Sequence, residues 1–269
     1  MILVETTVIN IVENVIIQSH TRNLEKGKGN LDISIFTMTL GGRDKYLRDC
    51  VSSVGQATYE AEMLSIHTEN PITIEHHVIF QGCKNNLYDL GLKNFDVIAH
   101  ELPQNIGIGA GINYIVPHLS GKLTLKFDDD CKIISKDFFS HCMFLDSVLG
   151  KSIWAPMVGG LQNNLCGVKG YAHSSIHDEE NDSYYQLRRV HHVGGICRFA
   201  RREIYEGFTF PNDLDKSGRI SGTEDGDLST YAQHNSIPMY YLDTAIYVEH
   251  NEGTLSQTLR YKDYFKLRG

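Results

Sequence analysis

The sequence predicts an α/β fold in which a mostly parallel central sheet carries helices on both of its faces. Short apolar runs rich in β-branched residues alternate with segments of helical periodicity, as in chains built from βαβ units. The chain has 269 residues, of which 41% are hydrophobic, and this suits one sizeable core. Polar clusters directly follow two of the apolar runs, where parallel sheets bind ligands.

The expected elements of the first half follow one another in order. Residues 32–40 and 72–80 are apolar runs typical of buried strands. Between them, residues 45–56 place apolar side chains at helical spacing. The further expectations are a strand at 95–100, a helix at 106–116 that opens in a Gly-rich turn, and a strand at 121–127.

The second half has a less regular pattern. Residues 159–183 are rich in Gly, Asn, His and Asp and are expected to form a long mobile loop, which could close over a substrate as a lid. Residues 192–206 pass from glycines into a predicted helix. Residues 239–248 are expected as a late strand or strand pair that ends just before His250.

The first 30 residues are predicted to be an extension, and residues 31–269 the main domain. Residues 2–18 are rich in Val and Ile, but Glu5 and Glu13 interrupt the run and no basic segment precedes it. Charges are costly inside a bilayer, so this run predicts one or two strands packed on the domain and no membrane span. Residues 19–30 are polar, contain two glycines and are expected as a linker.

Charge and cysteine content exclude some classes of function. The formal net charge of −8 gives no electrostatic support for broad nucleic-acid binding. The six cysteines form no CxxC pair and no disulfide framework, so a zinc cage is not expected. Free thiols and the lack of a signal peptide predict a cytoplasmic protein.

A run of three carboxylates, Asp128, Asp129 and Asp130, ends the apolar run 121–127. Such carboxylates repel one another unless a cation or proton balances them. Mn²⁺ and Mg²⁺ prefer hard oxygen ligands and often share them with substrate phosphates. The alternate carboxylates Asp128 and Asp130 suit such an ion, and a solvated acidic turn is the other interpretation.

Two later features also bear on chemistry. Glu224 and Asp225 precede a predicted helix, where carboxylates either complement the helix dipole or accept a proton from a substrate hydroxyl. His250 follows the late strand and is one of thirteen histidines, so by itself it is a weak candidate for a metal ligand.

Taken in order, six segments over about residues 32–255 resemble a family 2 glycosyltransferase with the glycosyltransferase A-type fold. The segments are ISIFTMTLGGRDKYLRDCVSSVGQ, QNIGIGAGIN, LTLKFDDDC, VGGICRFARREIYE, GTEDGDLS and IYVEHNEGT. The resemblance implies one Rossmann-like nucleotide-diphospho-sugar transferase domain over residues 31–269. The loop FQGCKNN, with Gln81 and Gly82, departs from the family pattern that holds the nucleotide base.

The resemblance also implies a role for each matching residue. Asp225 would be the general base of an inverting transfer, with Glu224 positioning the acceptor. Asp130, Asp128 and His250 would hold Mn²⁺ or Mg²⁺. The residues implied at the donor nucleotide are Thr37, Thr39, Arg43, Asn105, Gly109, Asp128 and Asp129.

The implied partner is a nucleoside-diphosphate sugar, with a UDP-sugar favoured. The acceptor hydroxyl could belong to a glycan, a lipid-linked sugar or a protein, and less readily to a nucleic acid. Two alternatives remain open from the sequence. One is a nucleotidyltransferase on a related scaffold, and the other is a non-catalytic module that binds a sugar or a protein.

Overall fold

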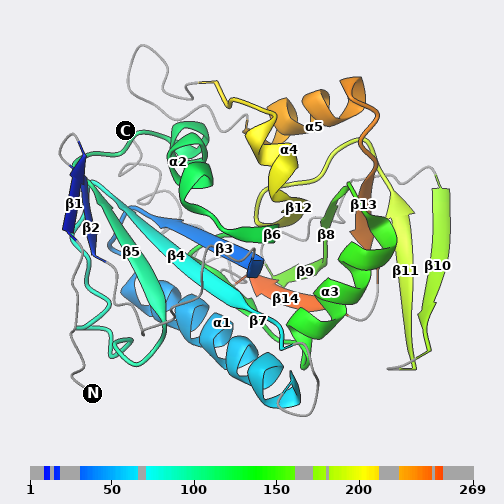
Figure 1. The fold of residues 1–269 in the computed structure, drawn as a ribbon, viewed down its shortest axis with the longest axis horizontal. Helices are drawn as coiled ribbons and strands as arrows, with labels where there is room; N and C mark the ends of the chain where they lie inside the picture. The colour runs from blue at the N-terminus through cyan, green and yellow to red at the C-terminus, as the bar shows by residue number, and fades with distance from the viewer. Residues whose placement is uncertain are drawn as a thin grey trace, which may run out of the picture.

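The structure is a computed structural model that describes residues 9–12, 15–18, 31–65, 71–160, 172–179, 182–211, 224–243 and 246–250. Its central feature is an 11-stranded sheet in the order β1-β2-β5-β4-β3-β6-β12-β8-β13-β11-β10 (Figure 1). The strands of this sheet are β1 (Ile9–Val12), β2 (Val15–Gln18), β3 (Leu31–Thr39), β4 (Ile74–Gln81), β5 (Val97–Leu102), β6 (Gly121–Phe127), β8 (Ile153–Ala155), β10 (Ala172–Asp178), β11 (Ser183–Arg189), β12 (Cys197–Arg201) and β13 (Met239–Leu242).

Helices lie on both faces of this sheet, as predicted. They are α1 (Asp44–Ser65), α2 (Ile108–Ile115), α3 (Phe138–Leu149), α4 (Arg202–Glu206) and α5 (Glu224–His234), with a short 3₁₀ turn at Val116–His118. Alternate residues of β3 point to opposite faces. Ile33 and Ile35 pack with α1 and α3, whereas Phe36 packs with α2, α4 and α5.

The predicted strands and helices of the first half are confirmed. Their ends differ by at most about two residues, except that α1 continues well beyond residue 56 to Ser65. The order β5-β4-β3-β6 is parallel throughout. Helix α1 connects the parallel neighbours β3 and β4. Helix α2 connects β5 to β6, which lie on either side of β4 and β3 in the same sheet. The parallel part therefore follows the alternation of strand and helix visible in the sequence.

The prediction of a mostly parallel sheet is wrong for the sheet as a whole, which is mixed. Beyond β6, only β8 and β13 pair in parallel, and β12 runs antiparallel to both β6 and β8. At the other end, β1 and β2 form an antiparallel hairpin on β5. After β6 the described elements no longer alternate regularly between one strand and one helix, and most neighbouring strands there are antiparallel.

Two expectations for the second half are corrected. Residues 192–206 contain the strand β12 before α4, where only a helix was expected. The expected loop 159–183 contains the whole of β10, which pairs with β11 in a seven-residue antiparallel register. Because β10 reads AHSSIHD at a sheet edge, it lacks the apolar alternation that marks a half-buried strand. Residues 161–171 of this segment and the expected linker 19–30 lie outside the described residues.

A second sheet of three strands brings the late part of the chain to the aspartate run. It consists of β7 (Cys131–Ile133), β14 (Tyr247–His250) and β9 (Met157–Gly160), with β14 in the middle. The antiparallel register places His250 opposite Cys131. Residues 239–248 thus contribute to two strands, β13 and the start of β14. These two strands belong to different sheets. Over the described parts of the chain, we find no helix that is long and apolar enough to span a membrane.

Candidate active site

The aspartate run forms a tight turn at the carboxyl end of β6. The backbone N–H of Cys131 donates to the carbonyl oxygen of Asp128 at 3.1 Å, and the N–H of Asp128 donates to Ile196 at 3.0 Å. This turn leaves the Asp128 side chain 37% exposed, whereas Asp129 and Asp130 are buried. The three carboxylates therefore point into different surroundings.

Arg43 and His250 both contact the buried aspartates. Nη2 of Arg43 lies 2.7 Å from Oδ2 of Asp130, and Nη1 lies 3.5 Å from Oδ1 of Asp129. Nε2 of His250 lies 3.2 Å from the same Asp130 oxygen. Burial acts to raise the pKa of Asp130, but His250 and Arg43 outweigh it and hold this pKa well below its usual range. Burial, with the neighbouring Asp130, raises the pKa of Asp129 to about 7 although Arg43 opposes this.

Asp130 and His250 are the described residues whose geometry could hold a divalent ion, provided that a substrate completes the coordination. An oxygen and an imidazole nitrogen converge here, and Oδ2 of Asp129 has no hydrogen-bond partner within the described residues. Those residues contain no group of three or more His, Cys, Asp or Glu arranged as a complete metal cage. Mg²⁺ bound to nucleotides commonly takes one or two protein carboxylates and fills its other positions with phosphate oxygens and water.

The remaining residues predicted at the donor lie along the carboxyl ends of β3 to β5. Thr39 is buried and accepts a hydrogen bond from the Gly41 N–H at 3.2 Å. Thr37 is completely buried, and its hydroxyl lies 3.1 Å from His76 Nε2, so it presents no surface to a ligand here. The Asn105 side chain accepts a hydrogen bond from the Gly107 N–H, and this contact shapes the turn before α2. Gly109 is buried in the first turn of α2.

The loop that departs from the family pattern packs against that turn. Oε1 of Gln81 accepts a hydrogen bond from the Ile106 N–H at 3.0 Å. Gly82 has a φ of +71°, and a Cβ there would lie 3.1 Å from the backbone nitrogen of Asn105. This close backbone approach explains the glycine. The FQGCKNN loop and the Asn105 turn therefore form one rim of the candidate site.

Glu224 and Asp225 begin α5 and face two buried cations. Asp225 Oδ1 lies 2.9 Å from Nη1 of Arg198, a β12 residue that is 0% exposed. Burial acts to raise the pKa of Asp225, but Arg198 and Lys126 outweigh it and lower this pKa. Burial and the charge of Asp225 raise the pKa of Glu224 to about 7. The pair thus favours one ionised carboxylate and one that holds its proton near neutral pH.

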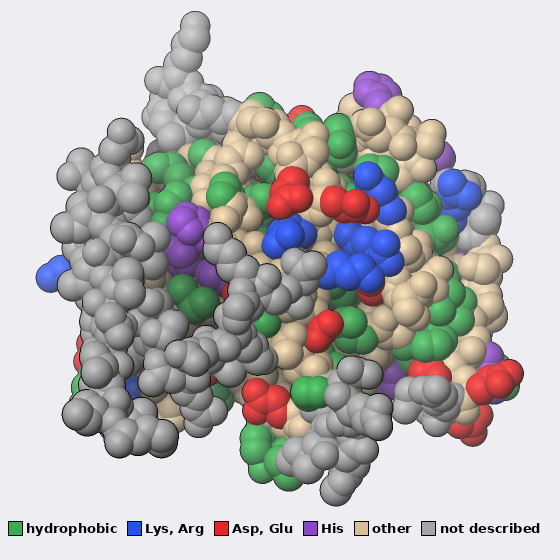
Figure 2. Space-filling view, in the orientation of Figure 1, with side chains coloured by type: hydrophobic (Ala, Val, Ile, Leu, Met, Phe, Trp, Pro, Cys, Tyr) green, Lys and Arg blue, Asp and Glu red, His purple; other side chains and the backbone are tan. Residues whose placement is uncertain are grey.

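Lys126 and Arg198 were not predicted from the sequence, although a cation inside each of the apolar runs LTLKF and ICRFA was a visible signal. Nζ of Lys126 lies 2.5 Å from both Oδ1 of Asp128 and the carbonyl oxygen of Gly195. Figure 2 shows acidic and basic side chains side by side near the centre of one face, over the region of β6, β12 and α4 in Figure 1.

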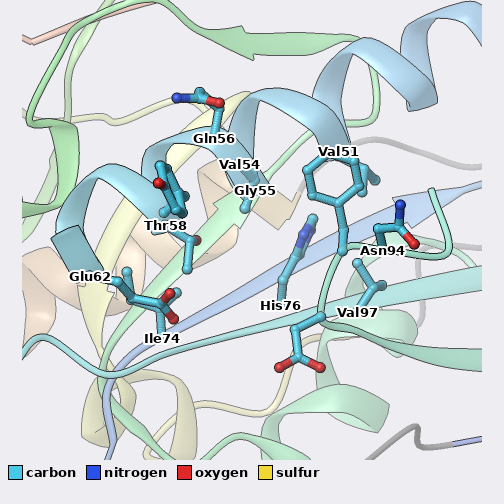
Figure 3. Close-up of a pocket in the computed structure, with 13 residues that line it drawn as sticks. Val51, Val54, Gly55, Gln56, Thr58, Glu62, Ile74, His76, Asn94 and Val97 are labelled. Atoms are coloured by element: carbon cyan, nitrogen blue, oxygen red, sulfur yellow. The ribbon is translucent and has the colours of Figure 1, made fainter. Parts of the chain in front are cut away.

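A cavity of about 350 Å³ lies elsewhere, between α1 and the amino-terminal ends of β4 and β5 (Figure 3). None of the residues predicted for the active site lines it. His76 lines the cavity and connects it to the buried Thr37 hydroxyl. Since ligands of open α/β sheets bind at the carboxyl ends of strands, this cavity is at the wrong edge for the donor.

Comparisons with known proteins identify solved structures of similar fold. No family model matches the sequence, and no curated protein matches it. Among solved structures, Staphylococcus aureus TarS matches with a TM-score of 0.57 and 14% identity, covering 86% of this chain and 38% of the TarS chain. TarS 1-349 in complex with UDP-GlcNAc matches with a TM-score of 0.57 and 15% identity, covering 83% of this chain and 60% of that one. The complex of TarS 1-349 with UDP gives 0.56 and 16%, covering 81% and 60%.

The chain therefore has a glycosyltransferase fold, and the comparisons assign it to no particular family. It spans 38% of the length of the full TarS chain. At this level of identity the likeness carries the fold alone, so the roles of individual residues rest on their geometry.

Proposed function

We propose that the protein is an inverting glycosyltransferase that moves a sugar from a nucleoside-diphosphate sugar, with UDP as the favoured nucleotide, to an acceptor hydroxyl. The observation that carries the proposal is the meeting of two carboxylate groups about 95 residues apart in the chain. Nζ of Lys126 contacts both Asp128 and the carbonyl oxygen of Gly195, and a Cβ on Gly195 would lie 2.2 Å from Oδ1 of Asp225. The structures of TarS with UDP-GlcNAc and UDP favour the same donor class.

The chain's own residues divide the reaction between them. Asp225, held ionised by Arg198, accepts the proton of the acceptor hydroxyl as its oxygen attacks the anomeric carbon. The bond from that carbon to the diphosphate breaks at the opposite face, and the nucleoside diphosphate leaves. Glu224, with its raised pKa, donates a hydrogen bond beside the base. Asp130 and His250 would hold Mn²⁺ or Mg²⁺, which neutralises charge on the leaving diphosphate when bound.

A panel of nucleotide sugars tests the proposal. The protein is incubated with Mn²⁺ or Mg²⁺ and UDP-, GDP-, CMP- or dTDP-sugars, and released nucleotide is measured with and without candidate acceptor glycans. We expect release of UDP from one UDP-sugar, and its loss on addition of EDTA. A parallel incubation contains a nucleoside triphosphate and a sugar phosphate, and release of pyrophosphate there would instead identify a nucleotidyltransferase. Donor binding without any release with all acceptors would favour a non-catalytic module.

Asp225→Asn sharpens the test of mechanism. The amide cannot accept the acceptor proton, so we expect turnover to fall about 10³-fold. Donor affinity, measured by calorimetry, should stay within about threefold because Asp225 does not contact the nucleotide in this mechanism. Unchanged turnover in this variant would remove Asp225 from the role of base. Asp227→Asn, in the same helical turn, is the matched control.

A further inference from the structure

Lys126 and Arg198 form a buried pair of like charges across two strands. The antiparallel register of β6 and β12 places them directly opposite each other. Lys126 is 2% exposed and Arg198 is 0% exposed. Their neighbours on the same strands, Leu125, Phe127 and Phe199, are buried apolar residues of the core. Burying each ion costs several kcal/mol, and apolar residues of similar volume would often be at least as stabilising.

Packing alone does not account for this pair. Arg198 donates from Nε to the Tyr205 hydroxyl at 3.3 Å and from Nη1 to Asp225, while its buried Nη2 has no hydrogen-bond partner among the described residues. An unsatisfied buried donor costs about 1–3 kcal/mol. Such an arrangement is typical of a functional site and not of an optimised core.

Each cation reaches a different part of the candidate active site. Arg198 holds the Asp225 carboxylate from one side, and its guanidinium carbon lies 5.9 Å from the centre of the Tyr205 ring. Lys126 connects the Asp128 turn to the carbonyl oxygen of Gly195. Gly195 in turn approaches Asp225 so closely that a Cβ on it would lie 2.2 Å from Oδ1.

We propose that Lys126 and Arg198 are positioning residues that fix the acceptor-side carboxylate Asp225 relative to the donor-side turn at Asp128. This inference rests on the proposed function and deepens it. Arg198 fixes the direction and the charge of Asp225, and Lys126 sets the distance between the two turns. In this role neither cation contacts the sugar or the nucleotide, so their removal should change turnover and leave donor binding in place.

Arg198→Met tests the first half of the proposal. We expect kcat to fall about 100-fold, since a displacement of about 1 Å at a reacting group has this effect, with UDP affinity within about threefold. Arg198→Lys keeps the positive charge but lacks the planar guanidinium group, so we expect its kcat to lie between those of Arg198→Met and the wild type. The matched control is Arg201→Met on the same strand, because Arg201 pairs with the buried Asp146 at 2.8 Å. Equal kcat losses in the two Met variants would reduce Arg198 to a structural role and overturn the proposal.

A second measurement does not depend on turnover. Carboxyl ¹³C NMR titration of Asp225, assigned with Asp225→Asn, should give a higher pKa in Arg198→Met than in the wild type, because the cation that favours the charged form is gone. An unchanged pKa would overturn the proposal even if no donor is ever found. A wild type that releases no nucleotide from any donor, with the expected pKa change, would count against the proposed function alone.

Lys126→Met tests whether the two cations act together. We expect a kcat loss of about tenfold, and a double variant that loses less than the product of the two single losses, because both act on the same carboxylate geometry. Losses that simply multiply would overturn the idea of one joint positioning device. Thermal unfolding of all four proteins shows which losses come from instability.

Discussion

The histidines on β4 and β5 and the cations on β6 and β12 are both buried in the central sheet, and they differ in charge. His76 and His100 are almost completely buried, and burial together with the nearby His77 lowers the pKa of each to about 3. Both are therefore neutral at physiological pH. Nε2 of His76 lies 3.1 Å from the Thr37 hydroxyl, and His100 lies between His77 and the Tyr114 hydroxyl.

The cations on β6 and β12 stay charged because carboxylates surround them. Burial acts to lower the pKa of Lys126 and of Arg198, yet nearby groups outweigh it and raise both values. Asp128, Glu224 and Asp225 supply this effect for Lys126. The comparison teaches that burial alone favours the neutral form of a basic side chain. Lys126 and Arg198 keep their charge because carboxylates lie close to them. The charged cluster is the one at the candidate active site.

Acidification should affect the neutral cluster most strongly. A histidine with a pKa of about 3 in the fold and about 6.5 when unfolded binds its proton first in the unfolded chain. The stabilisation by neutral His76 and His100 is therefore complete above pH 6.5 and is lost as the pH falls toward 3. Each histidine should lower the free energy of unfolding by about 1.4 kcal/mol per pH unit in this window. Urea unfolding at pH 7, 6, 5 and 4.5 measures this slope.

His100→Gln should reduce that slope whatever it does to stability at pH 7, because one of the two titrating groups is removed. His173→Gln, at an exposed histidine on β10, should leave the slope unchanged. A slope that is the same in all three proteins would mean that His100 is not kept neutral by the fold.

The contacts at the proposed donor side could largely be predicted from the sequence, because these residues lie at the ends of strongly patterned elements. Arg43 and the aspartate run follow β3 and β6, which are adjacent and parallel, so their side chains meet at one edge. His250 could be placed there only through the resemblance. Its contact with Asp130 depends on the three-stranded sheet, whose strands of three or four residues give no periodic signal.

The proposed acceptor side could be predicted only as a motif. Glu224 and Asp225 were recognisable by type and order, but their partners were not. The position of Arg198 opposite Lys126 follows from the antiparallel pairing of β12 with β6, and β12 itself was not expected. Long-range antiparallel pairing leaves no local trace when no tight hairpin joins the strands. The charged cluster is therefore a product of tertiary structure.

Gly195→Ala should disturb the charged cluster without removing a charge. The new methyl group would lie 2.2 Å from Oδ1 of Asp225 and 3.1 Å from Oε1 of Glu224, so the carboxylates must move. We expect kcat to fall about 10- to 100-fold because the base is displaced from the acceptor. Steady-state kinetics with the donor found in the panel, together with UDP calorimetry, measures this. A kcat equal to that of the wild type would show that the position of Asp225 is not critical.

Gly226→Ala is the matched change on the other side of Asp225 and should have the smallest effect. Gly226 lies exposed in the first turn of α5, and a Cβ there would meet no atom within 4 Å among the described residues. Alanine loses less backbone entropy than glycine in a helix, so the free energy of unfolding should rise by about 0.5–1 kcal/mol. Turnover should stay within about twofold. If Gly226→Ala instead lost as much turnover as Gly195→Ala, any added bulk near Asp225 would be harmful, and the specific contact between Gly195 and the carboxylate would not be the cause.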